Sequence, residues 1–100
     1  IGFSQGAYLS PHVAMALPNV NKVVGIGGRF YSHDFASVPR FKLRQVHGQE
    51  DQVVDPNETE LEHKKLKQRG VDSDLAIVSG AGHEINEPVS EALEKFLLHA

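Results

Sequence analysis

A serine between two glycines is the first residue of this chain whose surroundings indicate chemistry. Gly2-Phe3-Ser4-Gln5-Gly6 has the G-x-S-x-G pattern, in which the serine sits on a sharp strand-to-helix turn and the glycines relieve crowding. A helix beginning at Gln5 would aim its first backbone N–H groups at the serine, so that the Gln5 N–H can bind a developing oxyanion. The pattern alone is weak evidence, because Ser4 would also serve as an ordinary helix N-cap.

A serine hydroxyl is a poor nucleophile without a base, and the base needs an acid to orient it. We expect His83, which follows Gly82, to be the base and Asp51 to be the acid. The order Ser, Asp, His along the chain is one in which such a set occurs. Two alternatives stay open: Glu50 or Asp55 is the acid and Asp51 a turn residue, or His83 is an ordinary surface residue.

Short β-branched runs alternate with helical segments along the chain. Two of the runs are apolar throughout, as expected of parallel strands covered on both faces. The middle run alternates, with Phe41, Leu43 and Gln45 on one side. Strands are predicted over 22–27, 41–46 and 74–79, and helices over 5–17, over 58–69 and after 86–88.

The predicted helices differ in how they end and in which face is apolar. Pro11 removes a backbone donor inside the first helix and should kink or divide it. Gly70 closes the second helix at the position where glycine is favoured. The third helix carries an apolar stripe that consists of Val89, Ala92, Leu93, Phe96 and Leu97.

The alternation of helices and strands predicts the α/β class, with a parallel sheet and right-handed crossovers. Asp51 follows the second predicted strand, His83 follows the third, and Ser4 directly precedes the first helix. Because the carboxyl ends of parallel strands share one edge of the sheet, we expect all three side chains at that edge. Open α/β sheets bind their ligands there.

Composition and spacing exclude several other classes of function. The chain has no cysteine, which excludes disulfides, cysteine nucleophiles and zinc–thiolate sites. A net charge of -3 argues against a nucleic-acid partner, and no run approaches the roughly 18 apolar residues of a membrane span. The other histidines lack metal-ligand spacing, and His47, before Gly48, reads as a structural turn residue. Gly25-Ile26-Gly27-Gly28 lacks the third glycine of a dinucleotide fingerprint, so neither a metal nor a cofactor is expected.

Three strings can be taken together: Gly2-Phe3-Ser4-Gln5-Gly6-Ala7, then His47-Gly48 followed by Asp51 and Val53-Val54, then Gly82-His83. They resemble the α/β-hydrolase superfamily from its nucleophile elbow onward, in particular the small carboxylesterase/phospholipase and acyl-protein thioesterase branch. The resemblance implies an esterase or thioesterase without a cofactor, in which Ser4 is the nucleophile, His83 the general base and acid, and Asp51 the orienting acid. Gln5 would supply one oxyanion N–H.

Some residues depart from the pattern of that branch. Ala7 stands where a second glycine is usual, Asp55 precedes Pro56 where proline usually comes sooner, and Pro11 is unusual in the elbow helix. Similar strings occur in dienelactone-hydrolase-like and prolyl-peptidase-like enzymes. A prolyl-peptidase-like serine peptidase and a catalytically silent hydrolase-fold fragment are therefore the alternatives to a serine esterase or thioesterase.

The connection over 28–40 is too short for a large lid, which predicts an open site for small or protruding acyl chains. Aromatic side chains in this connection, together with one residue that follows the acid, are candidates for the substrate pocket, and ordinary packing is an equal alternative. The candidates are Phe30, Tyr31, Phe35 and Val54.

We expect residues 1–100 to form part of an α/β-hydrolase domain, about three parallel strands with flanking helices. In the family the resemblance points to, further strands precede the elbow, and a loop among them supplies the second oxyanion N–H. That missing half of the same domain is the expected partner, besides a small-molecule or acyl ester substrate. No targeting signal is visible, and the expected location is the cytoplasm.

Overall fold

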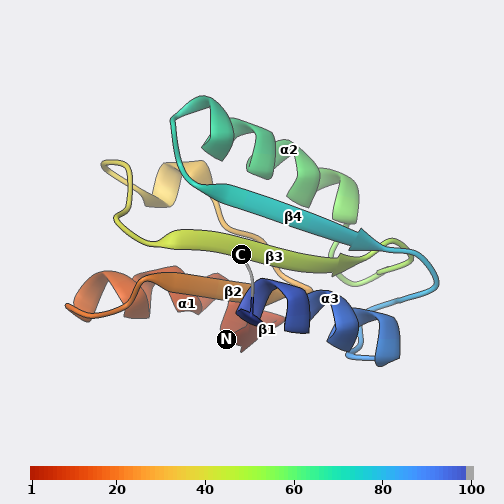
Figure 1. Cartoon of the computed structure of the whole chain (residues 1–100). Helices are drawn as coiled ribbons and strands as arrows, with labels where there is room; N and C mark the ends of the chain where they lie inside the picture. Colours follow the sequence, from red (N-terminus) through yellow and green to blue (C-terminus); the bar gives the residue numbers. More distant parts are fainter. Residues whose placement is uncertain (99–100) are drawn as a thin grey trace.

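Four parallel strands form the centre of the molecule in the computed structural model, which describes residues 1–98 (Figure 1). They lie side by side in the order β1 (Gly2–Phe3), β2 (Lys22–Ile26), β3 (Lys42–Gly48) and β4 (Ser73–Val78). The α/β class and the parallel sheet predicted from the sequence are confirmed. The sequence did not predict β1, because two residues are too few to show a strand pattern. The other three strands are the predicted ones.

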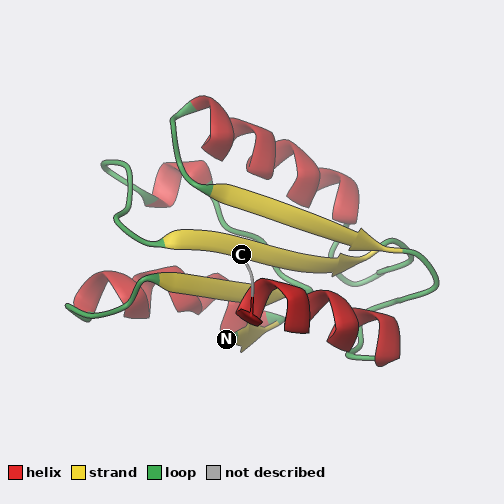
Figure 2. Ribbon diagram, viewed as in Figure 1, coloured by secondary structure: helices red, strands yellow, loops and turns green. Residues whose placement is uncertain are grey.

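Helices cover both faces of this sheet (Figure 2). One face carries α1 (Gln5–Ala16), α2 (Pro56–Gln68) and the 3-10 turn η1 (Ser32–Asp34), and α3 (Glu87–Leu98) packs on the other. Among residues 1–98, none of these helices has the length and apolar character that a bilayer crossing requires.

Pro11 does not divide α1, which runs unbroken from Gln5 to Ala16, so of the two predicted effects, a kink or a division, the division is wrong. Proline cannot donate one helical hydrogen bond, but its ring is buried here, and that packing offsets the loss. Both ends of α2 lie close to where the sequence predicts them. The Asp55 side chain accepts a hydrogen bond from the Asn57 N–H at 2.9 Å, and Gly70 adopts a φ of 85° just after the helix.

Two apolar clusters hold the layers together, one on each face of the sheet. The first joins α1 and α2 to the sheet through residues such as Ala14, Leu43 and Leu66. The second joins α3 to the sheet through Val46 and Phe96. Alternation along β3 therefore places successive side chains in different clusters, as a pleated strand requires.

Two details of the predicted burial are wrong. The third predicted strand, β4, is an edge strand, and its Ile77 side chain is 39% exposed rather than covered. Leu97 is 45% exposed, so the apolar stripe of α3 that packs on the sheet is narrower than predicted. In both cases the sequence shows an apolar residue but not how much of the sheet lies beneath it.

The polar side chain of Gln45 lies on the face of the sheet that carries the first apolar cluster, and it is only 2% exposed. Neither its Oε1 nor its Nε2 has a hydrogen-bond partner among residues 1–98. A buried amide without partners costs free energy that an apolar side chain of the same shape avoids. The alternation of Phe41, Leu43 and Gln45 predicts that Gln45 is buried with the other two. That prediction is correct, although glutamine is polar.

We therefore expect Gln45→Met to raise the free energy of unfolding by about 1 kcal/mol. Methionine has the length of glutamine and no group that needs a partner. Urea unfolding followed by circular dichroism measures the change, with Gln68→Met on the exposed face of α2 as the matched control. A Gln45→Met variant that is less stable than the wild type would contradict this account.

Candidate active site

Ser4 lies in the turn between β1 and α1 with a backbone φ of 55° and ψ of -115°. A positive φ is unusual for a residue with a side chain and costs about 1–3 kcal/mol. The Ser4 N–H donates to the Ile26 carbonyl at 2.8 Å, which ties the turn to the end of β2. A Cβ on Gly2 would lie 2.2 Å from the Gly6 carbonyl oxygen, so only glycine fits there. Apart from its chain neighbours and the backbone of its own helix, no atom of residues 1–98 lies within 4 Å of a Cβ placed on Gly6, so crowding explains Gly2 but not Gly6.

The Ser4 hydroxyl does not cap the helix that it precedes. Ser4 occupies the N-cap position of α1, yet its side chain makes no capping hydrogen bond. Its Oγ lies instead 2.9 Å from Nε2 of His83, a residue 79 positions away in the sequence. Ser4 therefore stands at the N-cap position of α1, but its hydroxyl contacts His83 and does not cap the helix.

Asp51 is the acid that reaches His83. Its Oδ2 accepts from His83 Nδ1 at 2.8 Å, and its side chain is fully buried. Of the two alternatives, Glu50 is exposed and Asp55 caps α2. The structure thus brings Ser4, His83 and Asp51 together in two hydrogen bonds in series.

The pKa of Asp51 lies below its usual value although the carboxyl group is buried. Burial alone would raise this pKa, but the Val54 N–H, the His83 ring and the Val53 N–H all favour the charged form. The two backbone N–H groups donate to Asp51 Oδ1, at 2.9 Å from Val53 and 2.8 Å from Val54. The carboxylate is therefore held ionised and oriented at neutral pH.

The loop that carries His83 packs directly on the turn that carries Asp51. The Glu50 N–H donates to the Ala81 carbonyl at 2.9 Å, and a Cβ on Gly48 would lie 2.4 Å from that oxygen. The Phe3 ring packs edge-on against the His83 ring, with the centroids 5.0 Å apart. Gly27, with a φ of 65°, lies on another side, where a Cβ would be 3.3 Å from His83 Nδ1. The imidazole therefore lies beside Phe3 of β1, Gly27 just after β2, and the acid turn.

The candidate pocket residues separate into two groups. Phe30 and Phe35 are 1% and 3% exposed and belong to the first apolar cluster, so they are packing residues and not pocket residues. Tyr31 lines a cavity of about 360 Å³ beside α2. Val54 lines another of about 510 Å³ beside the acid turn, together with Tyr8. The sequence does not separate these groups, because core and pocket both favour aromatic and aliphatic side chains.

His47 and Gly48 contribute more to this site than the sequence reading indicates. His47 is 1% exposed, and its Nε2 lies 3.3 Å from Asp51 Oδ2. It is the sixth residue of β3 and not a turn residue, which corrects the prediction. The sequence signal for this role is the His47-Gly48 pair, which lies four and three residues before Asp51. No group of His, Asp or Glu side chains among residues 1–98 is arranged to hold a metal ion.

This fold and this arrangement of serine, histidine and carboxylate define a protein of the α/β-hydrolase class. The chain belongs to the phospholipase/carboxylesterase family, whose model matches residues 1–99. It is similar to esterase YpfH of Escherichia coli (strain K12), with 32% identity over 87 residues, which are 86% of this chain and 38% of that protein.

Solved structures show the same fold. Esterase PE8 superposes with a TM-score of 0.79 at 29% identity, over 96% of this chain and 46% of that one. Acyl-protein thioesterase 2 of Zea mays superposes with a TM-score of 0.77 at 21% identity, over 96% of this chain and 52% of that one. The chain thus spans about half the length of these proteins or less.

We expect Gly48→Ala to lower the free energy of unfolding by about 1–3 kcal/mol, because the new methyl group would press on two backbone carbonyl oxygens at 2.4 Å. Gly6→Ala is the matched control, since open space surrounds its position and alanine favours a helix. Urea unfolding of both variants measures the difference. Equal stability of the two variants would show that the His83 loop does not need this close approach.

Proposed function

We propose that the protein hydrolyses a carboxylic ester or thioester through an acyl-enzyme on Ser4. The observation that carries the proposal is the pair of hydrogen bonds in series, Ser4 Oγ to His83 Nε2 at 2.9 Å and His83 Nδ1 to Asp51 Oδ2 at 2.8 Å. A carboxylate can only accept, so His83 Nδ1 carries a proton and donates it to Asp51. His83 Nε2 is then the nitrogen that can accept the Ser4 proton.

The reaction proceeds in two halves. Ser4 Oγ attacks the carbonyl carbon while its proton passes to His83 Nε2, and the alcohol or thiol leaves with that proton. A water molecule then attacks the acyl group and gives its proton to His83. The acid departs and the proton returns to Ser4 Oγ. Asp51, whose pKa is held low despite burial, stabilises the imidazolium that forms in each half.

The tetrahedral intermediates need hydrogen-bond donors for their oxyanion. Gln5 is the first residue of α1, and the first N–H groups of a helix have no acceptor inside the helix. Its N–H is the donor we assign to the oxyanion. We assign the second donor to a loop upstream of β1, as in the hydrolase pattern that the sequence resembles.

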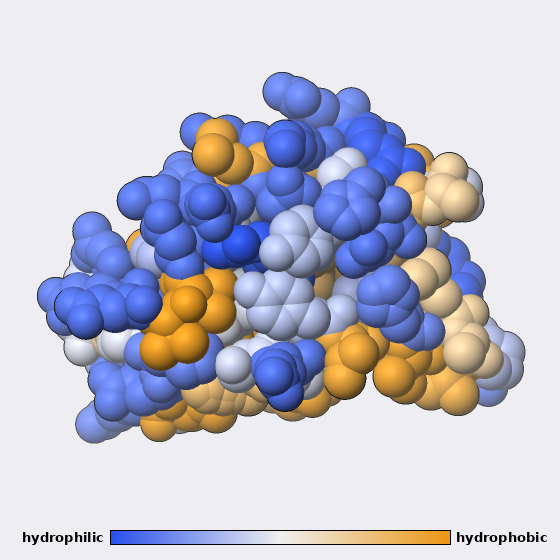
Figure 3. All heavy atoms as spheres, turned by 180° about the vertical axis from the view of Figure 1, so that it is seen from behind, coloured by the Kyte–Doolittle hydropathy of each residue, from blue (hydrophilic) through white to orange (hydrophobic). Residues whose placement is uncertain are grey.

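A surface of α1 supports the proposal that upstream strands of the same domain complete the fold. Leu9 and Val13 on α1, and Leu17 directly after its last residue, repeat every four residues and are 47–61% exposed. Figure 3 shows apolar side chains gathered at the lower right of the molecule, where α1 lies in that view. Exposed apolar stripes of this kind normally mark an interface.

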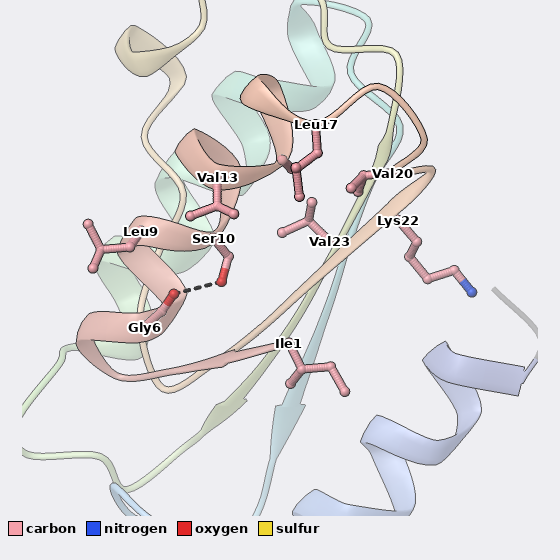
Figure 4. A pocket seen from close by; sticks show the side chains of 10 residues that line it. Ile1, Gly6, Leu9, Ser10, Val13, Leu17, Val20, Lys22 and Val23 are labelled. Atoms are coloured by element: carbon pink, nitrogen blue, oxygen red, sulfur yellow. Dashed lines mark hydrogen bonds between the residues drawn. The ribbon is translucent and has the colours of Figure 1, made fainter.

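The apolar stripe of α1 borders a cavity of about 370 Å³ beside β2 (Figure 4). Within residues 1–98, β1 pairs only with Gly25 and Ile26 of β2, so residues 22–24 have no strand partner on that side. A strand continuing upstream from β1 in the same register would pair with them and cover the cavity. Residues 1–100 are then one part of an α/β-hydrolase domain.

Labelling with a fluorophosphonate tests the nucleophile. Ser4 Oγ attacks phosphorus and fluoride leaves, so intact mass spectrometry should find one adduct on the chain. Ser4→Ala should remove the adduct, because it deletes the only atom proposed to react. A chain that labels equally well with Ser4→Ala would contradict the proposal.

If the 100-residue chain does not label, a longer chain distinguishes a missing oxyanion donor from a catalytically silent fold. If the folded 100-residue chain does not label but a longer chain with upstream residues does, the missing oxyanion donor accounts for the difference. If neither labels although both fold, the fold is catalytically silent and the proposal is wrong.

Paired substitutions test the covering of α1. Leu9→Gln with Val13→Gln should make the 100-residue chain more soluble, since both side chains are exposed in it. The same pair should destabilise a longer chain by about 2 kcal/mol or more, because it would bury two polar amides. Solubility and urea unfolding measure the two effects. Equal unfolding of the longer wild type and variant would show that this face stays exposed.

A further inference from the structure

His47 holds two groups of the acid turn at once. Its Nε2 lies 2.8 Å from the Val54 carbonyl oxygen and 3.3 Å from Asp51 Oδ2. A carbonyl oxygen only accepts, so Nε2 must carry a proton and donate it. His47 Nδ1 is buried and has no hydrogen-bond partner among residues 1–98, which agrees with the single ring proton lying on Nε2.

These contacts close a ring around the carboxylate. The Val54 N–H donates to Asp51 Oδ1 at 2.8 Å, while the Val54 carbonyl accepts from His47. The same His47 nitrogen lies 3.3 Å from Asp51 Oδ2, the oxygen that accepts from His83. Rotation of the carboxylate, or a shift of the turn, would break contacts on both sides of this ring.

We propose that His47 is a positioning residue that holds the Asp51 carboxylate and the Val54 carbonyl so that Oδ2 faces His83 Nδ1. His47 contacts no reacting atom and acts through Asp51 and His83. The inference rests on the proposed function for its catalytic consequence, whereas its geometric consequence for His83 does not depend on activity.

If His47 served only for packing, the requirements on its side chain would differ from those of a positioning residue. Packing requires only a side chain of suitable volume, because His47 is 1% exposed. Positioning requires an N–H donor where Nε2 lies. Glutamine can place an amide N–H near that point, and methionine has the same length without a donor, so His47→Gln and His47→Met form a matched pair.

The first measurement is the NMR signal of the His83 Nδ1 proton in the wild type and both variants. In His47→Met this signal should shift or broaden, because a carboxylate free to rotate holds the hydrogen bond between His83 Nδ1 and Asp51 Oδ2 less well. His47→Gln should restore most of the wild-type signal. An identical signal in all three proteins, or an equal change in both variants, would overturn the proposal. Urea unfolding of each variant separates these changes from loss of stability.

The second measurement is the rate of fluorophosphonate labelling, in whichever chain length labels in the wild type. We expect His47→Met to label about 10- to 100-fold more slowly, and His47→Gln to recover most of that loss, as for a hydrogen bond to a charged group. If the wild type does not label at any length, the proposed function fails while the NMR signal of the His83 Nδ1 proton still decides the role of His47. Equal labelling rates in both variants would overturn the positioning role.

The ring proton of His47 provides a test even if His47→Met does not fold. The ¹⁵N shifts of His47 must show the proton on Nε2, and Asp51→Asn must move the signal of that proton. A proton on Nδ1 alone, or a His47 signal that ignores Asp51→Asn, would overturn the proposal.

Discussion

The buried carboxylate of Asp51 is the interaction on which the local structure depends. A charge removed from water is costly unless donors surround it. Here two backbone N–H groups of its own turn bind one oxygen, and the rings of His83 and His47 approach the other. The turn after β3, the end of β3 itself and the loop after β4 must therefore lie where they do for the carboxylate to remain ionised. Ser4 is added to this arrangement through His83.

Bringing four chain segments to one point requires unusual backbone freedom. At Gly48 the acid turn and the His83 loop approach closely enough that a single methyl group would collide with two carbonyl oxygens. At Gly27 a positive φ lets the end of β2 pass beside the imidazole. Ser4 has a positive φ without being glycine, and the strain is held by its hydrogen bond to the end of β2. The geometry of the site thus depends on these two glycines as much as on its side chains.

The covering of the sheet is uneven. α3 buries Val89 and Phe96 against one face, whereas α1 buries Ala7 and Ala14 and leaves a stripe of larger apolar side chains in solvent. Small buried residues let the helix lie close to the sheet, while large exposed ones are what a second layer would contact. The hydrogen-bonded set of Ser4, His83 and Asp51 lies at the carboxyl edge of the strands.

The sequence by itself determined the α/β class and, to within a few residues, the bounds of α1, α2, α3, β2, β3 and β4, because periodicity acts locally. It also predicted that Ser4, Asp51 and His83 meet, because parallel strands share one edge, but it left Glu50 and Asp55 open as the acid. The tertiary structure decided that Phe30 and Phe35 are core residues and that the amide of Gln45 is buried without a partner. It also decided that His47 faces Asp51. Such outcomes depend on which surfaces meet across the sheet, and contacts between residues distant in sequence leave no periodic pattern in the chain.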